Sequence, residues 1–140
     1  MNICIINGPN LNLLGKREES HYGSFSLTEL QSYLTEKCPA NISLTFFQEN
    51  SEGAIIDYIQ NLKNTEGIVL NAAAYTHTSI GIRDALLAKK IPFIEVHISN
   101  VFKREEFRQK SFLSDIAIGI ISGLGKTGYL AALQYFQEMQ

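Results

Sequence analysis

The sequence predicts an α/β fold, a flavodoxin-like three-layer sandwich with helices on both faces of a five-stranded parallel sheet. Short runs rich in valine and isoleucine alternate along the chain with amphipathic stretches, a pattern typical of buried parallel strands joined by helices. Five such strand–helix units follow one another with short connections. The 140 residues are 45% hydrophobic and contain no repeat, linker or low-complexity segment, so we expect a single domain over residues 1–140.

The strands are predicted from short apolar runs. They are expected at residues 2–6, 42–46, 67–70, 92–96 and 116–121. The first, third and fourth runs are almost continuously apolar, which indicates strands that are buried on both faces. The second run alternates apolar and polar residues, which is the period of a strand with two different faces.

The helices are predicted from side chains that can cap them. Their expected starts are Ser26, Ser51, Thr78 or Ser79, and Lys126, with a further short helix near residues 104–108. Ser26-Leu-Thr-Glu29 is a capping box, in which the serine hydroxyl accepts a hydrogen bond from an amide of the first turn. The third helix is expected to end at Lys89-Lys90, where positive charge suits the negative end of the helix dipole.

Composition excludes several classes of function. The net charge of −2 and the isoelectric point near 5.9 give no basic surface for nucleic acid or for an anionic membrane. No apolar run approaches the ~20 residues that span a bilayer, and no secretory leader precedes the first strand, so we expect a cytoplasmic location. Cys4 and Cys38 lack metal-ligand or redox spacing and are interpreted as incidental thiols.

Polar clusters follow three of the apolar runs. Residues 7–12 contain three asparagines, Asn71 and residues 76–79 follow the third run, and residues 97–100 follow the fourth. The carboxyl ends of parallel strands meet at one edge of a sheet, where ligands bind. These clusters therefore predict one active site.

Glu95 and His97 are two residues apart on a predicted strand, so their side chains project from the same face. A carboxylate beside an imidazole fixes its tautomer and favours the protonated ring, which can donate a proton. The alternative is a surface ion pair at a strand end. The position at the carboxyl edge of a strand favours catalysis.

Arg17 and Tyr22 lie in an unusually long polar loop at residues 7–25, a length that suggests function. A nearby guanidinium could lower the pKa of the tyrosine from ~10 and produce a basic tyrosinate. Their spacing is equally compatible with an aromatic ring packed over an arginine stem.

Gly123-Leu-Gly-Lys-Thr127 imitates the end of a phosphate-binding P-loop. The glycine that this loop requires five positions earlier is replaced by Ile120. A glycine-rich turn that lets the last helix pack closely is the better interpretation.

Motifs along essentially the whole chain resemble the type II 3-dehydroquinate dehydratases. They are Asn7-Gly-Pro-Asn-Leu-Asn12, Leu14-Gly15, Arg17, Tyr22-Gly23, Leu70-Asn71, Tyr75-Thr-His-Thr-Ser79, Arg83-Asp84, Ile94-Glu-Val-His-Ile-Ser-Asn100, Arg104-Glu-Glu-Phe-Arg108, Gly123-Leu-Gly and Gly128-Tyr129. The run Ala72-Ala73-Ala74 departs from the family, in which we would expect a glycine.

The resemblance implies a cofactor-free, metal-free anti elimination of water from 3-dehydroquinate through an enolate, giving 3-dehydroshikimate in the shikimate pathway. It implies Tyr22 as the base, Arg17 as the group that lowers its pKa, and Asn10 as a holder of the water at the enolate oxygen. His97, oriented by Glu95, would protonate the leaving hydroxyl.

The resemblance also implies the binding groups and the assembly. Substrate would be held by Asn71, His77, Arg108, the backbone amides of Ile98 and Ser99, and Asp84 from a neighbouring subunit. The family assembles as a homododecamer, a tetramer of trimers, without nucleic acid or membrane partners.

Three other hypotheses share the predicted fold but fit the residues of this sequence less well. A flavin mononucleotide carrier would need a Ser/Thr/Gly-rich phosphate loop after the first strand, where this chain has Pro9 and three asparagines. A phospho-receiver would need an aspartate at the position of Asn71. A noncatalytic relative is disfavoured by the joint presence of Arg17, Tyr22 and His97.

Overall fold

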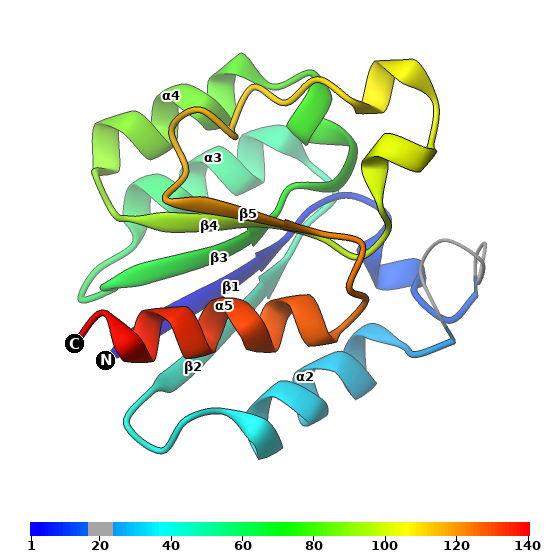
Figure 1. Ribbon diagram of the computed structural model, residues 1–140. Helices are drawn as coiled ribbons and strands as arrows, with labels where there is room; N and C mark the ends of the chain where they lie inside the picture. Colours follow the sequence, from blue (N-terminus) through cyan, green and yellow to red (C-terminus); the bar gives the residue numbers. More distant parts are fainter. Residues whose placement is uncertain (17–23) are drawn as a thin grey trace.

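The predicted three-layer α/β sandwich is confirmed by a computed structural model, which describes residues 1–16 and 24–140. Five parallel strands form one sheet in the order β2-β1-β3-β4-β5 (Figure 1). The strands are β1 (Asn2–Asn7), β2 (Ser43–Gln48), β3 (Gly67–Asn71), β4 (Phe93–His97) and β5 (Gly119–Ser122). The strand order reverses direction between β1 and β3, so the carboxyl ends of these two strands form the switch point where ligands bind in such sheets.

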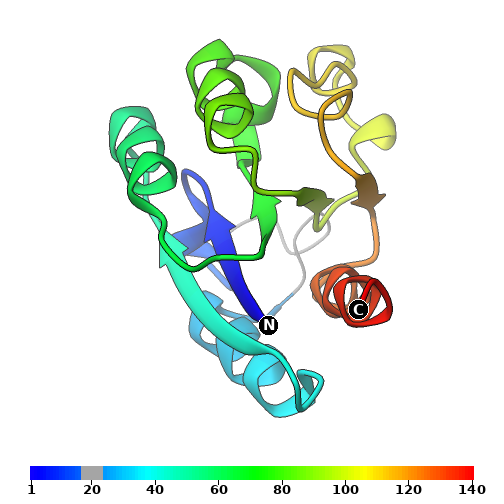
Figure 2. The same ribbon diagram turned by 90° about the vertical axis from the view of Figure 1, so that its left-hand side faces the viewer.

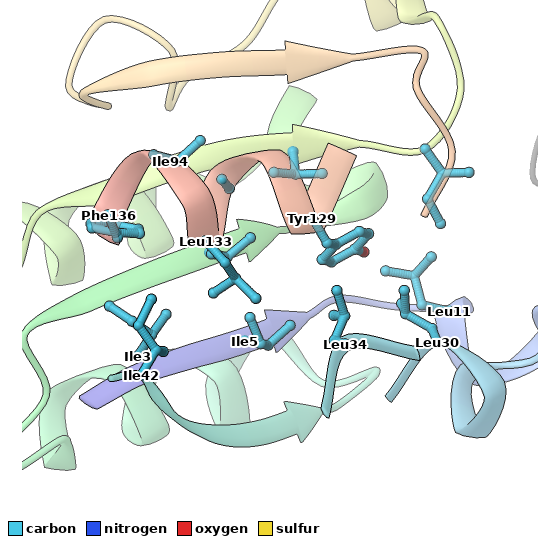
Figure 3. Packing of buried hydrophobic residues seen from close by; sticks show 14 of the residues in the cluster. Ile3, Ile5, Leu11, Leu30, Leu34, Ile42, Ile94, Tyr129, Leu133 and Phe136 are labelled. Carbon is cyan, nitrogen blue, oxygen red and sulfur yellow. The ribbon is translucent and has the colours of Figure 1, made fainter. Parts of the chain in front are cut away.

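Within the described part of the chain, two α-helices cover each face of the sheet. They are α2 (Leu27–Lys37) and α5 (Thr127–Glu138) on one face, and α3 (Glu52–Asn61) and α4 (Ile80–Lys89) on the other (Figures 1 and 2). Each face has its own buried apolar cluster, and Figure 3 shows Ile3 and Ile5 of β1 facing Leu133 and Phe136 of α5. Among the described residues, no helix is long and apolar enough to cross a membrane.

The predicted helix caps are confirmed for three helices. The Ser26 hydroxyl accepts from the Glu29 amide at 3.0 Å, and Ser51 and Ser79 cap α3 and α4 in the same way. The helix α4 ends at Lys89 as expected, so positive charge stands in its last turn. The Lys89 ammonium group also donates to the carbonyls of Gln60 and Leu62 at the end of α3.

Two predicted elements are wrong in detail. The last strand begins at Gly119 and not at residue 116, because the carbonyl of Leu113 accepts the amides of both Ile116 and Ala117 and closes a turn there. In place of one short helix near residues 104–108 there are two 3₁₀ segments, η3 (Val101–Lys103) and η4 (Glu106–Arg108). An apolar run and a charged stretch do not by themselves distinguish a strand or α-helix from tight turns.

Candidate active site

A cleft of about 560 Å³, its mouth included, opens beyond the carboxyl ends of β1, β3 and β4. It is lined by seven of the residues that the sequence singled out: Asn10, Asn71, His77, His97, Ile98, Ser99 and Arg108. The strand register explains this convergence, because Asn7 pairs with Asn71 and Leu70 pairs with Glu95 across the sheet. Polar residues at neighbouring strand ends are thereby brought to one edge.

Glu95 and His97 form a buried hydrogen-bonded pair at the end of β4. Nε2 of His97 lies 2.9 Å from Oε2 of Glu95, and the two residues are 6% and 2% exposed. Burial raises the pKa of Glu95. The hydrogen bond and charge of His97 and the hydroxyls of Ser111 and Ser114 outweigh it, so that the pKa lies below its ordinary value of 4.5. An ionised carboxylate on Nε2 leaves Nδ1 as the nitrogen of His97 available to other partners.

The second histidine, His77, lies beside His97 with their ring centroids 6.3 Å apart. Its Nδ1 donates to the carbonyl of Lys110 at 2.7 Å, which leaves Nε2 of the neutral ring as an acceptor. Burial lowers the pKa of His77 below its ordinary value of 6.5, and the charges of His97 and Arg108 act in the same direction. His77 therefore suits a hydroxyl donor.

Asn71 is fixed by a hydrogen-bonded chain that the sequence reasoning did not anticipate. Its Nδ2 donates to the hydroxyl of Tyr129 at 2.8 Å, which in turn donates to Oδ1 of Asn7 at 2.6 Å. Oδ1 of Asn71 accepts from the amide of Ala73. Burial raises the pKa of Tyr129 far above its ordinary value of 10, so its hydroxyl keeps its proton. No other contact of Asn71 occurs among residues 1–16 and 24–140, so its second N–H can donate into the cleft.

The segment after β4 supplies backbone donors. The amides of Ile98 and Ser99 donate to no backbone carbonyl within residues 1–16 and 24–140. By contrast, Gly123 and Gly125 donate their amides to the carbonyls of His97 and Ile98 at 3.2 and 3.0 Å. Two amides of the glycine-rich turn that imitates a P-loop therefore donate to backbone carbonyls of the protein and stabilise the end of β4.

Two loops cross closely at the floor of the cleft. The amide of Gly8 donates to the carbonyl of Asn71 at 2.7 Å, and a side chain at Gly8 would collide with the carbonyl oxygen of Ala72. Asn10 follows in the left-handed conformation at φ 68°, and its amide donates to Oδ1 of Asn50 at 2.9 Å. Only glycine allows this crossing, which brings Asn10 over the cleft.

Some residues singled out by the sequence lie elsewhere. Asp84 is exposed on α4 and does not line the cleft of this chain. Its neighbour Arg83 pairs with Asp115 and donates to the carbonyl of Phe112. Arg17 and Tyr22 lie outside the described residues.

Three residues near the cleft were not assigned a role from the sequence. Arg104 lines the cleft and donates to the Ser99 hydroxyl at 3.4 Å. The hydroxyls of Ser111 and Ser114 donate to the carboxylate of Glu95. Arg104 belongs to a motif of the resemblance and could have been found there. The two serines carry no local signal, because their partner is 16 and 19 residues away.

The cleft combines the buried Glu95–His97 pair with the polar side chains of Asn71 and His77 and with two arginines, Arg104 and Arg108. Such a set suits a small polyhydroxylated acid that undergoes proton transfer. Within residues 1–16 and 24–140, no three His, Cys, Asp or Glu side chains gather to hold a metal ion.

Comparisons with known proteins agree with this chemistry. Residues 1–137 match the model of the family described as dehydroquinase class II. A 3-dehydroquinate dehydratase of Prochlorococcus marinus (strain MIT 9301) is 56% identical over 136 residues, which cover 96% of this chain and 92% of that protein. One of Enterobacter sp. (strain 638) is 57% identical over 134 residues, covering 94% and 89%. The crystal structure of a type II dehydroquinase from Butyrivibrio crossotus superposes with a TM-score of 0.94 at 48% identity, covering 98% of this chain and 97% of that one.

Proposed function

The chain belongs to the class II dehydroquinase family and dehydrates 3-dehydroquinate, and we propose that it does so by anti elimination through an enolate. The product is 3-dehydroshikimate, and the reaction serves the shikimate pathway. The observation that carries this mechanism is the buried Glu95–His97 pair inside a cleft of hydroxyl-binding groups. A buried imidazole beside a carboxylate is suited to give a proton to a departing hydroxyl.

In this mechanism the first step removes a proton beside the substrate ketone. We assign this step to Tyr22, with Arg17 lowering its pKa and stabilising the developing charge, on the strength of the motif resemblance. Asn10 lines the cleft and would hold the water that hydrogen-bonds the enolate oxygen. A preorganised donor at a developing oxyanion is usually the largest contribution to such catalysis.

The second step protonates the leaving hydroxyl. Nδ1 of His97 delivers the proton, because Nε2 is engaged by Glu95. As the enolate re-forms its carbonyl, its electron pair makes the new C=C bond and the C–O bond breaks. The hydroxyl leaves as water with the proton from His97, so the step needs no redox partner. Glu95 stabilises the imidazolium before transfer and holds the ring in place.

The remaining groups bind the substrate. The free N–H of Asn71 meets the region of the leaving hydroxyl, and Nε2 of His77 and the guanidinium of Arg108 take ring hydroxyls. The amides of Ile98 and Ser99 receive the carboxylate, as two adjacent backbone donors do in anion-binding turns.

We further propose that the whole chain is one catalytic domain and that it works in the cytoplasm as a homododecamer, a tetramer of trimers. The position of Asp84 supports an assembly. It is exposed and away from the cleft of its own chain, so it can act on substrate only in the cleft of a neighbouring subunit.

A rate assay with 3-dehydroquinate, followed by the ultraviolet absorbance of the conjugated enone, tests the proposed mechanism. Turnover should survive borohydride treatment in the presence of substrate, since no lysine imine takes part. Tyr22→Phe and His97→Ala should each lose most turnover, by about 10²-fold or more. Wild-type rates in either variant would overturn the roles given to these residues.

A further inference from the structure

Residues 110–115 pass behind both histidines of the cleft, and we call this segment the strap. In the strap, the carbonyl oxygen of Lys110 accepts a hydrogen bond from Nδ1 of His77, with 2.7 Å between the two atoms. Its two serine hydroxyls, of Ser111 and Ser114, donate to the two carboxylate oxygens of Glu95 at 2.7 and 2.9 Å. One short segment thus provides the hydrogen-bond acceptor of His77 and also contacts Glu95, the acceptor of His97.

The strap is itself held at several points. The amide of Phe112 donates to the carbonyl of Thr76 at 2.9 Å, and the Phe112 carbonyl accepts from Arg83 of α4 at 2.8 Å. Leu113 is completely buried in the apolar cluster under α3 and α4. The Ser111 hydroxyl also accepts the amides of Leu113 and Ser114, both at 3.0 Å, which closes a tight turn. The serine hydroxyls are therefore presented to Glu95 from a packed base.

Glu95 needs these donors. A carboxylate that is 2% exposed loses its hydration, which raises its pKa unless hydrogen bonds replace the lost water. His97 provides one donor to Oε2, and the serines provide one more to each oxygen. A carboxylate held at both oxygens can neither rotate nor turn away from Nε2 of His97.

We propose that Ser111 and Ser114 are positioning residues, which keep Glu95 ionised and oriented so that His97 presents Nδ1 to the leaving hydroxyl. This inference rests on the proposed function and assigns a role to two residues that do not touch substrate. The strap thereby couples the positions of the proton donor and the hydroxyl-binding His77.

Ser114→Ala is the cleaner of the two tests. The Ser114 hydroxyl donates to Glu95 alone among the described residues, whereas Ser111→Ala also removes the acceptor that closes the turn. We expect kcat to fall about tenfold in Ser114→Ala, and KM for 3-dehydroquinate to change less than about twofold, because proton delivery is impaired and substrate contacts are kept. Ser114→Thr keeps a hydroxyl and should recover most of the rate.

A double-mutant cycle separates positioning from general structural support. In a Glu95→Ala background, Ser114→Ala should change kcat by less than about twofold, because the serine acts through the missing carboxylate. The same tenfold loss in both backgrounds would overturn the proposal, as would an unchanged kcat in the wild-type background. A wild-type rate in His97→Ala would instead contradict the proposed function, whatever the result for Ser114.

Lys89→Met is the matched control for lost hydrogen bonds. Lys89, at the end of α4 farther from the cleft, donates to two carbonyls at the end of α3, so its loss should lower thermal stability and leave kcat unchanged. If Lys89→Met lowered kcat as much as Ser114→Ala does for the same loss of thermal stability, a positioning role for Ser114 would be excluded.

Discussion

At the scale of single residues, the chemistry of the cleft depends on which nitrogen of each histidine carries a proton. A carbonyl can only accept, so Nδ1 of His77 is protonated where it meets Lys110. The ionised Glu95 requires the proton of His97 on Nε2. The two rings therefore present opposite nitrogens to the cleft, Nε2 from His77 and Nδ1 from His97. Nε2 of the neutral His77 ring can only accept, whereas Nδ1 of His97 donates from the doubly protonated ring, whose positive charge the Glu95 carboxylate stabilises.

Tyr129→Phe is expected to impair the site by removing the hydroxyl that links Asn71 at the end of β3 to Asn7 at the end of β1. The change leaves Nδ2 of Asn71 and Oδ1 of Asn7 without their shared partner, and these residues are 3% and 1% exposed. An unsatisfied buried polar group costs about 1–3 kcal/mol, so the free energy of unfolding should fall by that amount. Substrate binding should weaken, measured as a rise in KM, because Asn71 then keeps only its contact with the Ala73 amide among the described residues and is held less firmly.

Tyr135→Phe on the same helix is the control for this variant. Tyr135 is 48% exposed, and its substitution should leave both stability and KM unchanged. Equal behaviour of the two variants would contradict a positioning role for Tyr129.

The ionisation of Glu95 also predicts a dependence of stability on pH. Its pKa in the folded protein lies below the ordinary 4.5, so the ionised group contributes stability above pH 4.5 and this contribution is lost as the pH falls through the folded value. In urea unfolding, the difference in stability between the wild type and Glu95→Gln should be large at pH 6 and shrink below about pH 4.5.

Glu36→Gln on the exposed face of α2 serves as the control for the removal of a carboxylate. A wild-type advantage that persists undiminished in strong acid would show that Glu95 is not stabilised as a carboxylate.

At the scale of elements, the loops after β1 and β3 decide the shape of the cleft. Gly8 permits their backbones to touch, and the second loop continues through the 3₁₀ segment η2 (Ala73–His77) into α4. Within this loop Ala73 has a φ of 50°, whereas Ala72 has a φ of −75°. The glycine that the family resemblance leads us to expect in the run Ala72–Ala74 thus has a structural place, at the left-handed Ala73.

Ala73→Gly should therefore stabilise the protein. The left-handed conformation costs a residue with a side chain about 1–2 kcal/mol, and glycine adds about 0.5–1 kcal/mol of unfolded-state entropy. The expected gain in the free energy of unfolding is up to about 1 kcal/mol, seen as a higher Tm. Ala72→Gly should destabilise, because its φ suits alanine and its buried methyl is lost. Destabilisation by both substitutions would refute the strain at Ala73.

At the scale of the whole molecule, the sheet order places the cleft at the carboxyl ends of the neighbouring strands β1 and β3, while Asp84 on α4 does not line it. The helices α2 to α5 cover the two faces of the sheet (Figure 2). The strand β5 forms an edge, at which the side chains of Ile118 and Ile120 are exposed. An assembly that pairs the cleft of one chain with α4 of another would complete the site that we propose.

Mixing two impaired variants tests this arrangement. Asp84→Ala and His97→Ala should each have low activity, but co-assembled subunits should regain activity in about a quarter of the sites, where an intact His97 and an intact Asp84 come from different chains. Mixing His97→Ala with Tyr22→Phe is the matched control. These two residues are expected to serve one cleft from the same chain, so no recovery should follow. Without recovery in the first mixture, Asp84 has no role across a subunit boundary.

Much of the fold follows from local patterns in the sequence. Apolar runs marked the strands, and Ser26, Ser51 and Ser79 marked helix starts, because the period of side chains and the capping of amides act over a few residues. Residues 116–118 were misassigned to a strand because an apolar run does not reveal that Leu113 closes a turn.

The polar residues at the strand ends could also be predicted from local sequence, since a strand and the residue after it are neighbours in the chain. The contacts of each of these residues depend instead on how distant segments pack. Tyr129 meets Asn7 across 122 residues, and Ser111 and Ser114 reach Glu95 from a separate segment. Such bonds depend on how α5 and the strap pack against the sheet, and packing between distant segments leaves no periodic trace in the sequence.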